Sequence, residues 1–270
     1  MRSEMILWGG LLVLSGCGGG GDNATEAANG GVPAEVVDVA AAPAVAAPKV
    51  DCDTVKGQTA PEGQPADDIM GIRQGMTAEQ VRNVLQCKNA SFAINSRNST
   101  VSLPGGGSMP RVDVYADTGL EKVNVWLVGP AGQERVVHVD RRTEYTAGKE
   151  LPVDSIEKEL AAKYGGFDTQ AGGRWGRIVR SRDGQRITQD NSSYGQCASH
   201  NITTDRVMPC LNVVSYEIGA NNQNPALASN FNVAITSQAA VAEMTQAAQA
   251  QQGAAVEAAR DAVNKQGLGL

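Results

Sequence analysis

The chain has 270 residues, which is enough for one or two domains with ordinary hydrophobic cores. Its formal net charge of −6 gives no general reason to expect a nucleic-acid partner, and we predict none. Only 4% of the residues are aromatic while 31 are glycine, which indicates that part of the chain does not pack into a core.

The first feature in chain order is an apolar run at residues 5–14. It is shorter than the about 20 residues that a membrane-spanning helix needs, and it has the length of the apolar segment of a signal peptide. The sequence Leu14-Ser15-Gly16-Cys17 follows and resembles the cleavage box of bacterial lipoproteins, Leu-[Ala/Ser]-[Gly/Ala]-Cys. The alternative is an ordinary secretory signal.

The resemblance to lipoproteins implies that residues 1–16 are a signal peptide and that Cys17 is acylated, for example with palmitate. Each buried methylene contributes about 0.8 kcal/mol, so a multiply acylated cysteine is a durable membrane anchor. Gly18 would occupy the second position of the mature chain, which implies sorting to the outer membrane with the protein facing the periplasm. We therefore expect attachment to the membrane through the N-terminal lipid.

Residues 17–64 are predicted to be the lipidated cysteine and a flexible tether. Positions 18–49 are rich in Gly, Ala, Val and Pro and show neither helical nor strand periodicity. A flexible chain of this length has an r.m.s. reach of roughly 30 Å. The tether would therefore keep the folded part within about one domain diameter of the membrane.

Four cysteines remain once Cys17 is set aside, and an even number in an oxidising periplasm predicts two disulfides. Several pairings are possible. Proximity in sequence favours Cys52–Cys87 and Cys197–Cys210. A zinc site built on Cys197, His200 and Cys210 is the alternative, but no well-spaced fourth ligand lies nearby, so we predict no metal.

The first predicted helix begins at Thr77 and ends near Cys87. Thr77 is a suitable N-cap, and Gln80 lies three residues later, where its side chain can complete a capping box. An apolar stripe runs along one face, at Val81, Val84 and Leu85. The preceding Asp67-Asp68 is expected to be a solvated lead-in.

Strands are predicted after this helix from alternating or β-branched runs: 91–95, 111–116, 121–128 and 134–139. The glycine-rich stretch 104–110 is expected to be a flexible loop, because it lacks the Gly-Lys-[Ser/Thr] of a phosphate-binding loop. A protein that inhibits a hydrolase would present a protruding loop, and 98–110 is the candidate for one.

A second helix is predicted after residue 151, with Asp154 as its cap, an apolar stripe that ends at Tyr164 and Gly165 as its stop. Further strands are predicted after it at 174–181, 186–188, 211–218 and 231–236. The Ala/Gln-rich tail 237–270 is predicted to be a marginal solvated helix or disordered, with a coiled coil as the alternative.

These elements predict an α+β fold in which two capped helices are each followed by antiparallel strands. The arrangement suggests a duplicated helix-sheet unit, with sub-units at about 65–148 and 149–236. We expect one continuous module over 65–236.

Two stretches resemble known envelope proteins. GIRQGMTAEQVRNVLQC at 71–87 is similar to the opening of SmpA/OmlA-type outer-membrane lipoproteins. LAAKYGGF at 160–167 resembles the Lys-Tyr-Gly-x-Pro helix end of related proteobacterial envelope proteins, with Phe167 where proline is usual. The resemblance implies a small layered module, related in shape to β-lactamase inhibitor proteins, that makes protein contacts.

The sequence offers little for catalysis. Its two histidines are His138 and His200, and His138 lies in a strand-like alternation where a structural role is expected. No Gly-x-Ser-x-Gly or His-Glu-x-x-His motif occurs, and we predict no catalytic residue. Five arginines surround one predicted hairpin and could bind phosphate or carboxylate groups: Arg174, Arg177, Arg180, Arg182 and Arg186.

Together these features predict an outer-membrane-anchored periplasmic lipoprotein, without enzymatic activity or cofactor, that binds an envelope protein. Two alternatives remain open: a lipoprotein inhibitor of a hydrolase, and a module that binds cell-wall glycan or lipopolysaccharide through the arginine hairpin.

Overall fold

A computed structural model describes residues 50–55, 57–169, 174–202, 204 and 209–266, and all of them belong to one compact unit. The predicted signal peptide (1–16), the lipidation site Cys17 and the tether up to residue 49 lie outside the described residues.

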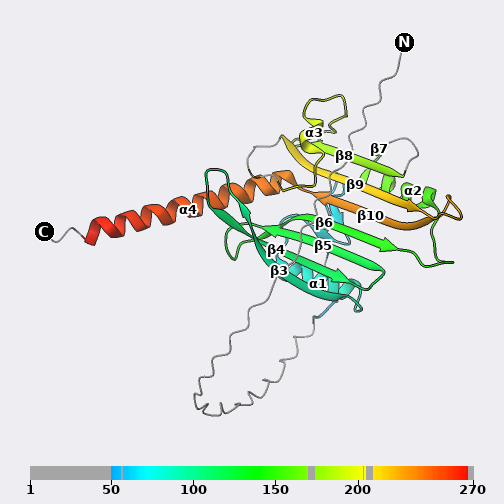
Figure 1. Ribbon diagram of the computed structural model, residues 1–270, viewed down its shortest axis with the longest axis horizontal. Helices are drawn as coiled ribbons and strands as arrows, with labels where there is room; N and C mark the ends of the chain where they lie inside the picture. The colour runs from blue at the N-terminus through cyan, green and yellow to red at the C-terminus, as the bar shows by residue number, and fades with distance from the viewer. Residues whose placement is uncertain (1–49, 56, 170–173, 203, 205–208, 267–270) are drawn as a thin grey trace, which may run out of the picture. The chain divides into compact units, whose positions relative to one another are not determined.

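The first part of the fold begins with a small lead-in hairpin, β1 and β2, followed by α1 and the strands β3 to β6 (Figure 1). Its elements are β1 (Asp68–Ile69), β2 (Ile72–Arg73), α1 (Ala78–Lys88), β3 (Ala93–Ser102), β4 (Ser108–Asp117), β5 (Glu121–Val128) and β6 (Arg135–Glu144).

The second part again begins with a helix that is followed by strands. Its elements are α2 (Val153–Tyr164), β7 (Asp168–Thr169), β8 (Trp175–Ser181), α3 (Tyr194–Cys197), β9 (Cys210–Ala220), β10 (Ala228–Thr236) and α4 (Gln238–Gln266).

Eight of the strands form one antiparallel sheet, in the order β3-β4-β5-β6-β10-β9-β8-β7. The predicted α+β class is therefore confirmed. The last strand of the first part, β6, pairs with the last strand of the second part, β10, so these two strands form the centre of the sheet. β1 and β2 form a separate small hairpin.

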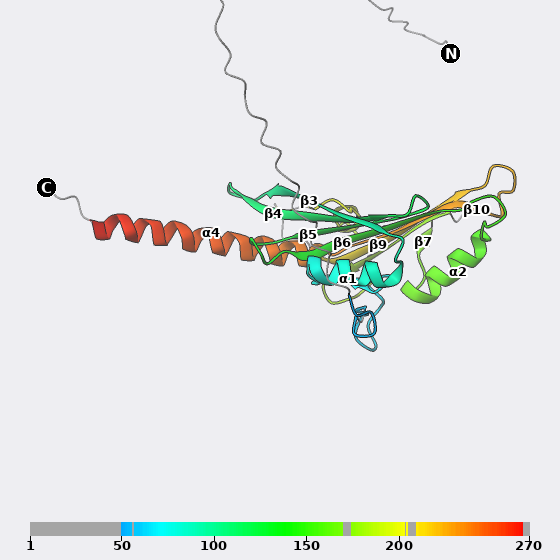
Figure 2. The same ribbon diagram turned by 90° about the horizontal axis from the view of Figure 1, so that it is seen from below.

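α1 and α2 cover the same face of the sheet (Figure 2). The main core lies between them and the strands, and it is dominated by branched aliphatic side chains because alternate strand residues point to this face. Its strand contribution includes Val114, Val123, Val125, Leu127, Val139, Ile178, Val214, Ile218, Phe231, Val233 and Ile235.

α1 forms as the sequence predicts. The Thr77 side chain accepts a hydrogen bond from the Gln80 backbone N–H at 3.3 Å, and the Thr77 backbone N–H donates to Gln80 Oε1 at 2.8 Å, which completes a capping box. Val81, Val84 and Leu85 are buried against the sheet. The helix ends at Lys88, one residue beyond the expected end.

α2 begins differently from the prediction. Its N-cap is Pro152, whose side chain has no group that can accept a hydrogen bond, and Asp154 lies inside the first turn. The carboxylate there still interacts favourably with the helix dipole. The predicted apolar stripe up to Tyr164 is buried, and the C-cap Gly165 has a φ of 89°, which favours glycine.

The segment 98–110 does not protrude as a loop. β3 continues to Ser102 and β4 begins at Ser108, so only 103–107 forms the turn. β3 is an edge strand with mostly exposed side chains, so its sequence carries no hydrophobic alternation that could reveal its length. The turn lies along α4, where Gln249 Nε2 donates to the Pro104 carbonyl at 3.0 Å.

Asp67 and Asp68 are buried, not solvated as expected. Asp67 pairs with Arg73 at 2.6 Å, and Asp68 pairs with Lys163 of α2 at 3.0 Å. The Tyr164 hydroxyl also donates to the Asp68 carbonyl at 2.8 Å. These bonds fix the lead-in against the second helix.

The C-terminal tail is the helix α4, and its first half is part of the fold. Val241 and Ala248 are buried against Met109, Val128 and Val137. From residue 253 to 265 every side chain is exposed. The predicted strand at 186–188 is reduced to a single bridge between Arg180 and Arg186.

Candidate functional site: the open face of the sheet

The face of the sheet opposite α1 and α2 carries polar and aromatic side chains. We call it the open face; the first half of α4 packs on one end of it, where Trp126 is partly buried against the cluster of Met109, Val128, Val137 and Val241. The strand register places on it Asn95, Arg97, Arg111, Asp113, Tyr115, Asn124, Trp126, His138, Asp140, Trp175, Arg177, Ser215, Asn232 and Thr236. These positions alternate with the core residues, so their side chains point away from the two helices.

Both tryptophans of the described residues lie on the open face, and each has an arginine over its ring. The guanidinium carbon of Arg111 is 4.4 Å from the ring centroid of Trp126. The guanidinium carbon of Arg177 is 4.7 Å from the ring centroid of Trp175. One pair lies in each part of the sheet, and both have the geometry of a cation–π interaction.

Asp113 positions the first of these pairs. Its carboxylate is buried and accepts hydrogen bonds from Arg111 Nε at 2.5 Å and from Arg97 Nη2 at 3.0 Å. The charge of Asp113 is thus compensated by two arginines on β3 and β4. Arg111 is thereby held over Trp126.

Beside Trp126 the open face is exposed to solvent. The side chain of Tyr115 is 40% exposed, and its cross-strand neighbours Asn95 and Asn124 are exposed as well. Asp140 accepts hydrogen bonds from Asn124 Nδ2 at 2.9 and 2.8 Å. Burial raises the pKa of the Asp140 carboxyl, and the hydrogen bond from Asn124 opposes that shift.

Two histidines far apart in the sequence meet on this face through one hydroxyl. Nδ1 of His138 on β6 and Nδ1 of His200 each lie 2.7 Å from Thr236 Oγ1 on β10. Nε2 of His200 lies 2.7 Å from Ser215 Oγ on β9. The ring of His138 also stacks on Trp126, with 3.9 Å between centroids, so the network continues to the Arg111 pair.

The single hydrogen of the Thr236 hydroxyl constrains the two imidazoles. Thr236 can donate to only one Nδ1 and must accept from the other, so in the neutral network the two rings carry their Nδ1 protons oppositely. Burial, followed by the nearby His200 and Arg111, lowers the pKa of His138 to about 3. Burial and Arg177 lower the pKa of His200 to about 4. Both rings are therefore neutral at pH 7.

The arrangement resembles a serine–histidine pair, with Thr236 orienting the base. Ser215 is mid-strand, and Thr236 offers a hydroxyl where hydrolytic triads place a carboxylate. A neutral imidazole with so low a pKa is a weak base for activating a serine hydroxyl. The two imidazoles and two hydroxyls form one connected hydrogen-bond network.

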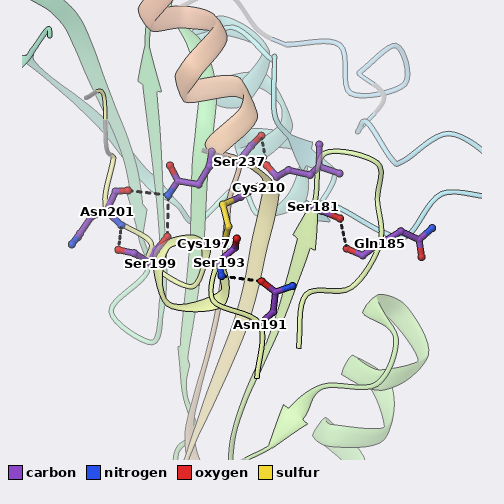
Figure 3. The surroundings of a disulfide bond; sticks show 11 residues. Ser181, Gln185, Asn191, Ser193, Cys197, Ser199, Asn201, Cys210 and Ser237 are labelled. Carbon is purple, nitrogen blue, oxygen red and sulfur yellow. Dashed lines mark hydrogen bonds between the residues drawn. A yellow bond between two sulfur atoms is a disulfide. The ribbon is translucent and has the colours of Figure 1, made fainter. Parts of the chain in front are cut away.

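His200 reaches this network from the segment that follows α3: its neighbours Ser199 and Asn201 lie beside the Cys197–Cys210 disulfide at the start of α4 (Figure 3). The Cys197–Cys210 disulfide ties the end of α3 to the start of β9. Gln238 at the start of α4 donates to the carbonyls of Ser199 and Asn201, each at 3.0 Å. The backbone on both sides of His200 is therefore fixed.

Both favoured disulfides are present, Cys52–Cys87 and Cys197–Cys210. The first joins the lead-in to the last turn of α1, and Cys52 is exposed. The second is fully buried in a small cluster with Val179, Ile187 and Val213. The described residues contain no group of three or more His, Cys, Asp and Glu side chains that could hold a metal ion.

The five arginines of the predicted anion site do not share a surface. Arg177 lies on the open face, whereas Arg180 points to the opposite face and donates from Nη2 to the Tyr164 carbonyl at 2.7 Å. Arg186 pairs with Asp168 at 2.7 Å, and Arg174 donates to the Pro225 carbonyl at 3.3 Å. Arg182 also interacts with other groups.

Sequence reasoning missed the histidine network and the arginine–tryptophan pairs. His138 was expected to be structural, and His200 was considered only as a metal ligand. The one available signal was the run of polar and aromatic residues at alternate strand positions, Asn124, Trp126, His138 and Asp140. That pattern places them on one face but does not indicate which strands are neighbours.

None of the helices in the described part of the chain is both long and apolar enough to cross a membrane. Comparison of the chain with protein-family models, with curated proteins and with solved structures gives no match.

Proposed function

We propose that this protein is an outer-membrane lipoprotein, acylated at Cys17 and facing the periplasm, whose open face binds a folded envelope protein without catalysing a reaction. The observation that carries the proposal is the pair of arginine–tryptophan stacks on the face opposite α1 and α2, where the Trp126 pair lies at the border of the area that α4 covers. Tyr115 adds an exposed aromatic ring to the same face.

Tryptophan, tyrosine and arginine are the residues that contribute most to protein–protein binding energy. The first pair is already ordered on the open face: Asp113 holds Arg111, and His138 on the neighbouring strand stacks on Trp126. Little side-chain entropy would be lost on binding, which favours affinity. A broad, rigid sheet surface fits a folded partner better than a small molecule.

The two sides of the edge strand β3 offer a matched test. Asn95 pairs with Tyr115 and points to the open face, whereas Asn98 pairs with the core-facing Val112 and points to the other side. Both are exposed. A photo-cross-linking amino acid at position 95 should capture a specific envelope protein in cells, and the same residue at position 98 should not.

Capture at 98 but not at 95, or of no specific protein from either position, would refute binding through the open face. If position 95 captures a specific protein, replacing Tyr115 by Ala should reduce the captured amount roughly tenfold, which is the size of effect expected for an interface aromatic residue.

The anchor has its own test. Metabolic labelling with an alkyne-tagged palmitate should label the wild-type protein, and Cys17→Ala should remove the label. Label retained by Cys17→Ala would exclude lipidation at this cysteine. The protein should fractionate with the outer membrane, and recovery with the inner membrane would contradict the proposed sorting.

The alternative of a hydrolase inhibitor would use the same open face, since 98–110 forms a tight hairpin along α4. The captured partner decides between the two: an inhibitor would recover a hydrolase and reduce its activity. Glycan binding through the arginine hairpin has less support, because the arginines point to different sides.

We also propose that the fold arose by duplication of a helix-sheet unit. The support is the order of elements: α1 precedes the antiparallel strands β3 to β6, and α2 precedes β7 to β10. Both helices contribute to one core on the same face of the sheet. Superposition of the two halves tests the idea, because helix should fall on helix and strand on strand; halves that do not superpose would contradict it.

A further inference from the structure

The two edges of the eight-stranded sheet end differently. At one edge, β7 pairs with two residues of β8, and the segment that follows β8 folds back along the rest of that strand. The Ile187 N–H donates to the Val179 carbonyl at 2.8 Å, and the Ser181 N–H donates to the Gln185 carbonyl at 2.9 Å. These contacts cover the backbone of β8, so this edge is protected against pairing with another strand.

β3 forms the other edge, and it is long and regular (Figure 1). It has 10 residues, from Ala93 to Ser102, and it pairs with β4 without a register shift. Proteins usually protect an edge with a short strand, a proline, a bulge or a charged side chain. β3 contains no proline, and its one charged residue, Arg97, is held on the open face by a hydrogen bond from Nη2 to Asp113 at 3.0 Å. β3 therefore lacks the usual protection of an edge strand.

The hydrogen-bond pattern shows which backbone groups of β3 point outward. The Leu103 N–H donates to the Gly107 carbonyl at 3.1 Å, and this pair continues the register of β3 with β4. Hydrogen-bonded pairs alternate along an antiparallel ladder, so odd-numbered residues of β3 bond to β4 and even-numbered residues point their N–H and C=O groups away from it. The Ser102 carbonyl agrees with this pattern, because it accepts a hydrogen bond from the Thr204 hydroxyl at 2.8 Å.

Four other even-numbered residues lie along this edge: Ile94, Ser96, Asn98 and Thr100. Within the described part of the chain, no strand lies beyond β3 and no group bonds to their outward-pointing backbone. Ser96, Asn98 and Thr100 are also exposed. A row of backbone groups of this kind is a template for the addition of another strand.

We propose that two copies of this chain pair through β3, antiparallel and about a two-fold axis at Asn98, so that their sheets become one. Asn98 then faces Asn98 of the second copy and Ser96 faces Thr100, which gives about six backbone hydrogen bonds between the chains. Arg97 faces Ser99, so the two arginines are not directly opposite each other. An axis at Arg97 would place these like charges opposite each other, which is unfavourable.

The proposed axis is perpendicular to the sheet, so the open faces of both copies lie on the same side and form one continuous surface. The Cys52–Cys87 disulfide ties the lead-in to α1 on the helix side, and this end of both chains therefore also lies on one side. A contact between two identical edges closes on itself, and the other edge is covered, so the assembly stops at a dimer. The pairing goes beyond the proposed function and does not depend on it.

Cysteine trapping tests the register in the full chain carrying Cys17→Ala, where the four remaining native cysteines are paired. Facing residues of a hydrogen-bonded pair have Cα atoms about 5.5 Å apart, which suits a disulfide, whereas residues four positions out of register are about 13 Å apart. Under mild oxidation, Asn98→Cys should form covalent dimers roughly tenfold faster than Ser96→Cys or Thr100→Cys alone. A mixture of Ser96→Cys and Thr100→Cys should form covalent heterodimers as fast as Asn98→Cys does.

Two further substitutions at position 98 give an independent readout in that mixture. Asn98→Pro removes an N–H that does not bond to β4, so it should leave the thermal unfolding midpoint nearly unchanged and abolish the heterodimer. Asn98→Ala keeps the N–H and should retain the heterodimer.

Equal cross-linking of the three single cysteine variants, or none with Asn98→Cys, would overturn the pairing. A heterodimer that persists with Asn98→Pro would overturn it as well, and the single cysteine variants decide if the proline variant does not fold. In the photo-cross-linking test of the open face, a product with a second copy has twice the mass of the chain, which distinguishes it from a captured envelope protein.

Discussion

The first part of the sheet, α1 with β3 to β6, and the second, α2 with β7 to β10, share an order of elements but are stabilised differently. α1 starts with a capping box between residues three apart in sequence, and β3 and β4 meet in a short turn. α2 has no side-chain cap, and β8 and β9 are joined by a long connection that contains α3.

The second part compensates with contacts between distant residues. The Cys197–Cys210 disulfide closes its long connection, Arg180 satisfies the last carbonyl of α2, and His200 bonds to two strands. Two halves with the same order of elements are thus stabilised differently. The first part depends on interactions between residues close in sequence, and the second part depends on contacts between distant residues.

The largest expected effect comes from the disulfides. Closing loops of 35 and 13 residues contributes about 4 and 3 kcal/mol in the chain-entropy model. Replacing Cys197 and Cys210 by Ala should reduce the free energy of unfolding by more than the loop-closure value of this disulfide, because both side chains are fully buried. The pair Cys52 and Cys87 lies near the surface, so its replacement should not add such a loss. Denaturant unfolding of both double variants measures this. A smaller loss for the buried pair would contradict the comparison.

Acid should destabilise the histidine network that joins the two parts, His138 on β6 and His200 before β9. The folded-state pKa values of about 3 for His138 and about 4 for His200 lie below the unfolded value near 6.5, so the unfolded chain binds protons first. Stability is full above pH 6.5 and falls as the pH decreases toward those values, by about 2 kcal/mol for each histidine at pH 5.

The unfolding free energy at pH 7.5 and at pH 5 measures this loss. His200→Gln, which keeps groups that can bond to Thr236 and Ser215, should remove about half of the difference between the two pH values. An unchanged difference in this variant would show that other groups cause the acid sensitivity.

Two neighbouring arginines should differ in their effect on stability. Arg180→Met leaves the Tyr164 carbonyl at the end of α2 without its donor and should cost about 1.5 kcal/mol. Arg186→Met removes only an exposed ion pair with Asp168 and should cost less than about 1 kcal/mol. Thermal unfolding of the two variants compares their losses of stability. Equal losses would show that the hydrogen bond from Arg180 to the Tyr164 carbonyl stabilises the fold no more than the exposed ion pair of Arg186 does.

The smallest expected effect concerns the local interactions at the starts of α1 and α2. Thr77→Ala removes the side-chain cap of α1 and should cost about 1 kcal/mol. Asp154→Ala at the start of α2 removes a first-turn charge without a cap and should cost a few tenths of a kcal/mol, on the order of a dipole interaction. Urea unfolding of both variants measures the pair. A larger loss of unfolding free energy for Asp154→Ala than for Thr77→Ala would show that Asp154, and not Thr77, acts as the stronger helix cap.

Local patterns predicted much of the first part correctly. The cap at Thr77, the buried stripe to Leu85 and the span of β5 follow from interactions within a few residues, which a sequence displays directly. β3 was predicted too short, because an exposed edge strand has no hydrophobic alternation and is defined by its pairing with β4.

The second part and the candidate site depended on distant partners. The burial of Asp68 depends on Lys163, and the position of Arg180 depends on the end of α2. Periodicity shows that alternate residues share a face but not which strands are adjacent. The sequence therefore could not predict that His138 and His200 share the Thr236 hydroxyl.

The sequence by itself determined the α+β class, the capped first helix and the expectation of two disulfides with a favoured pairing, because these depend on short-range periodicity, on local hydrogen bonds and on an even number of cysteines close in sequence. Only the tertiary structure decided that β6 pairs with β10. That pairing creates one continuous sheet, places the tryptophans and histidines on its open face, and leaves β3 as its long edge.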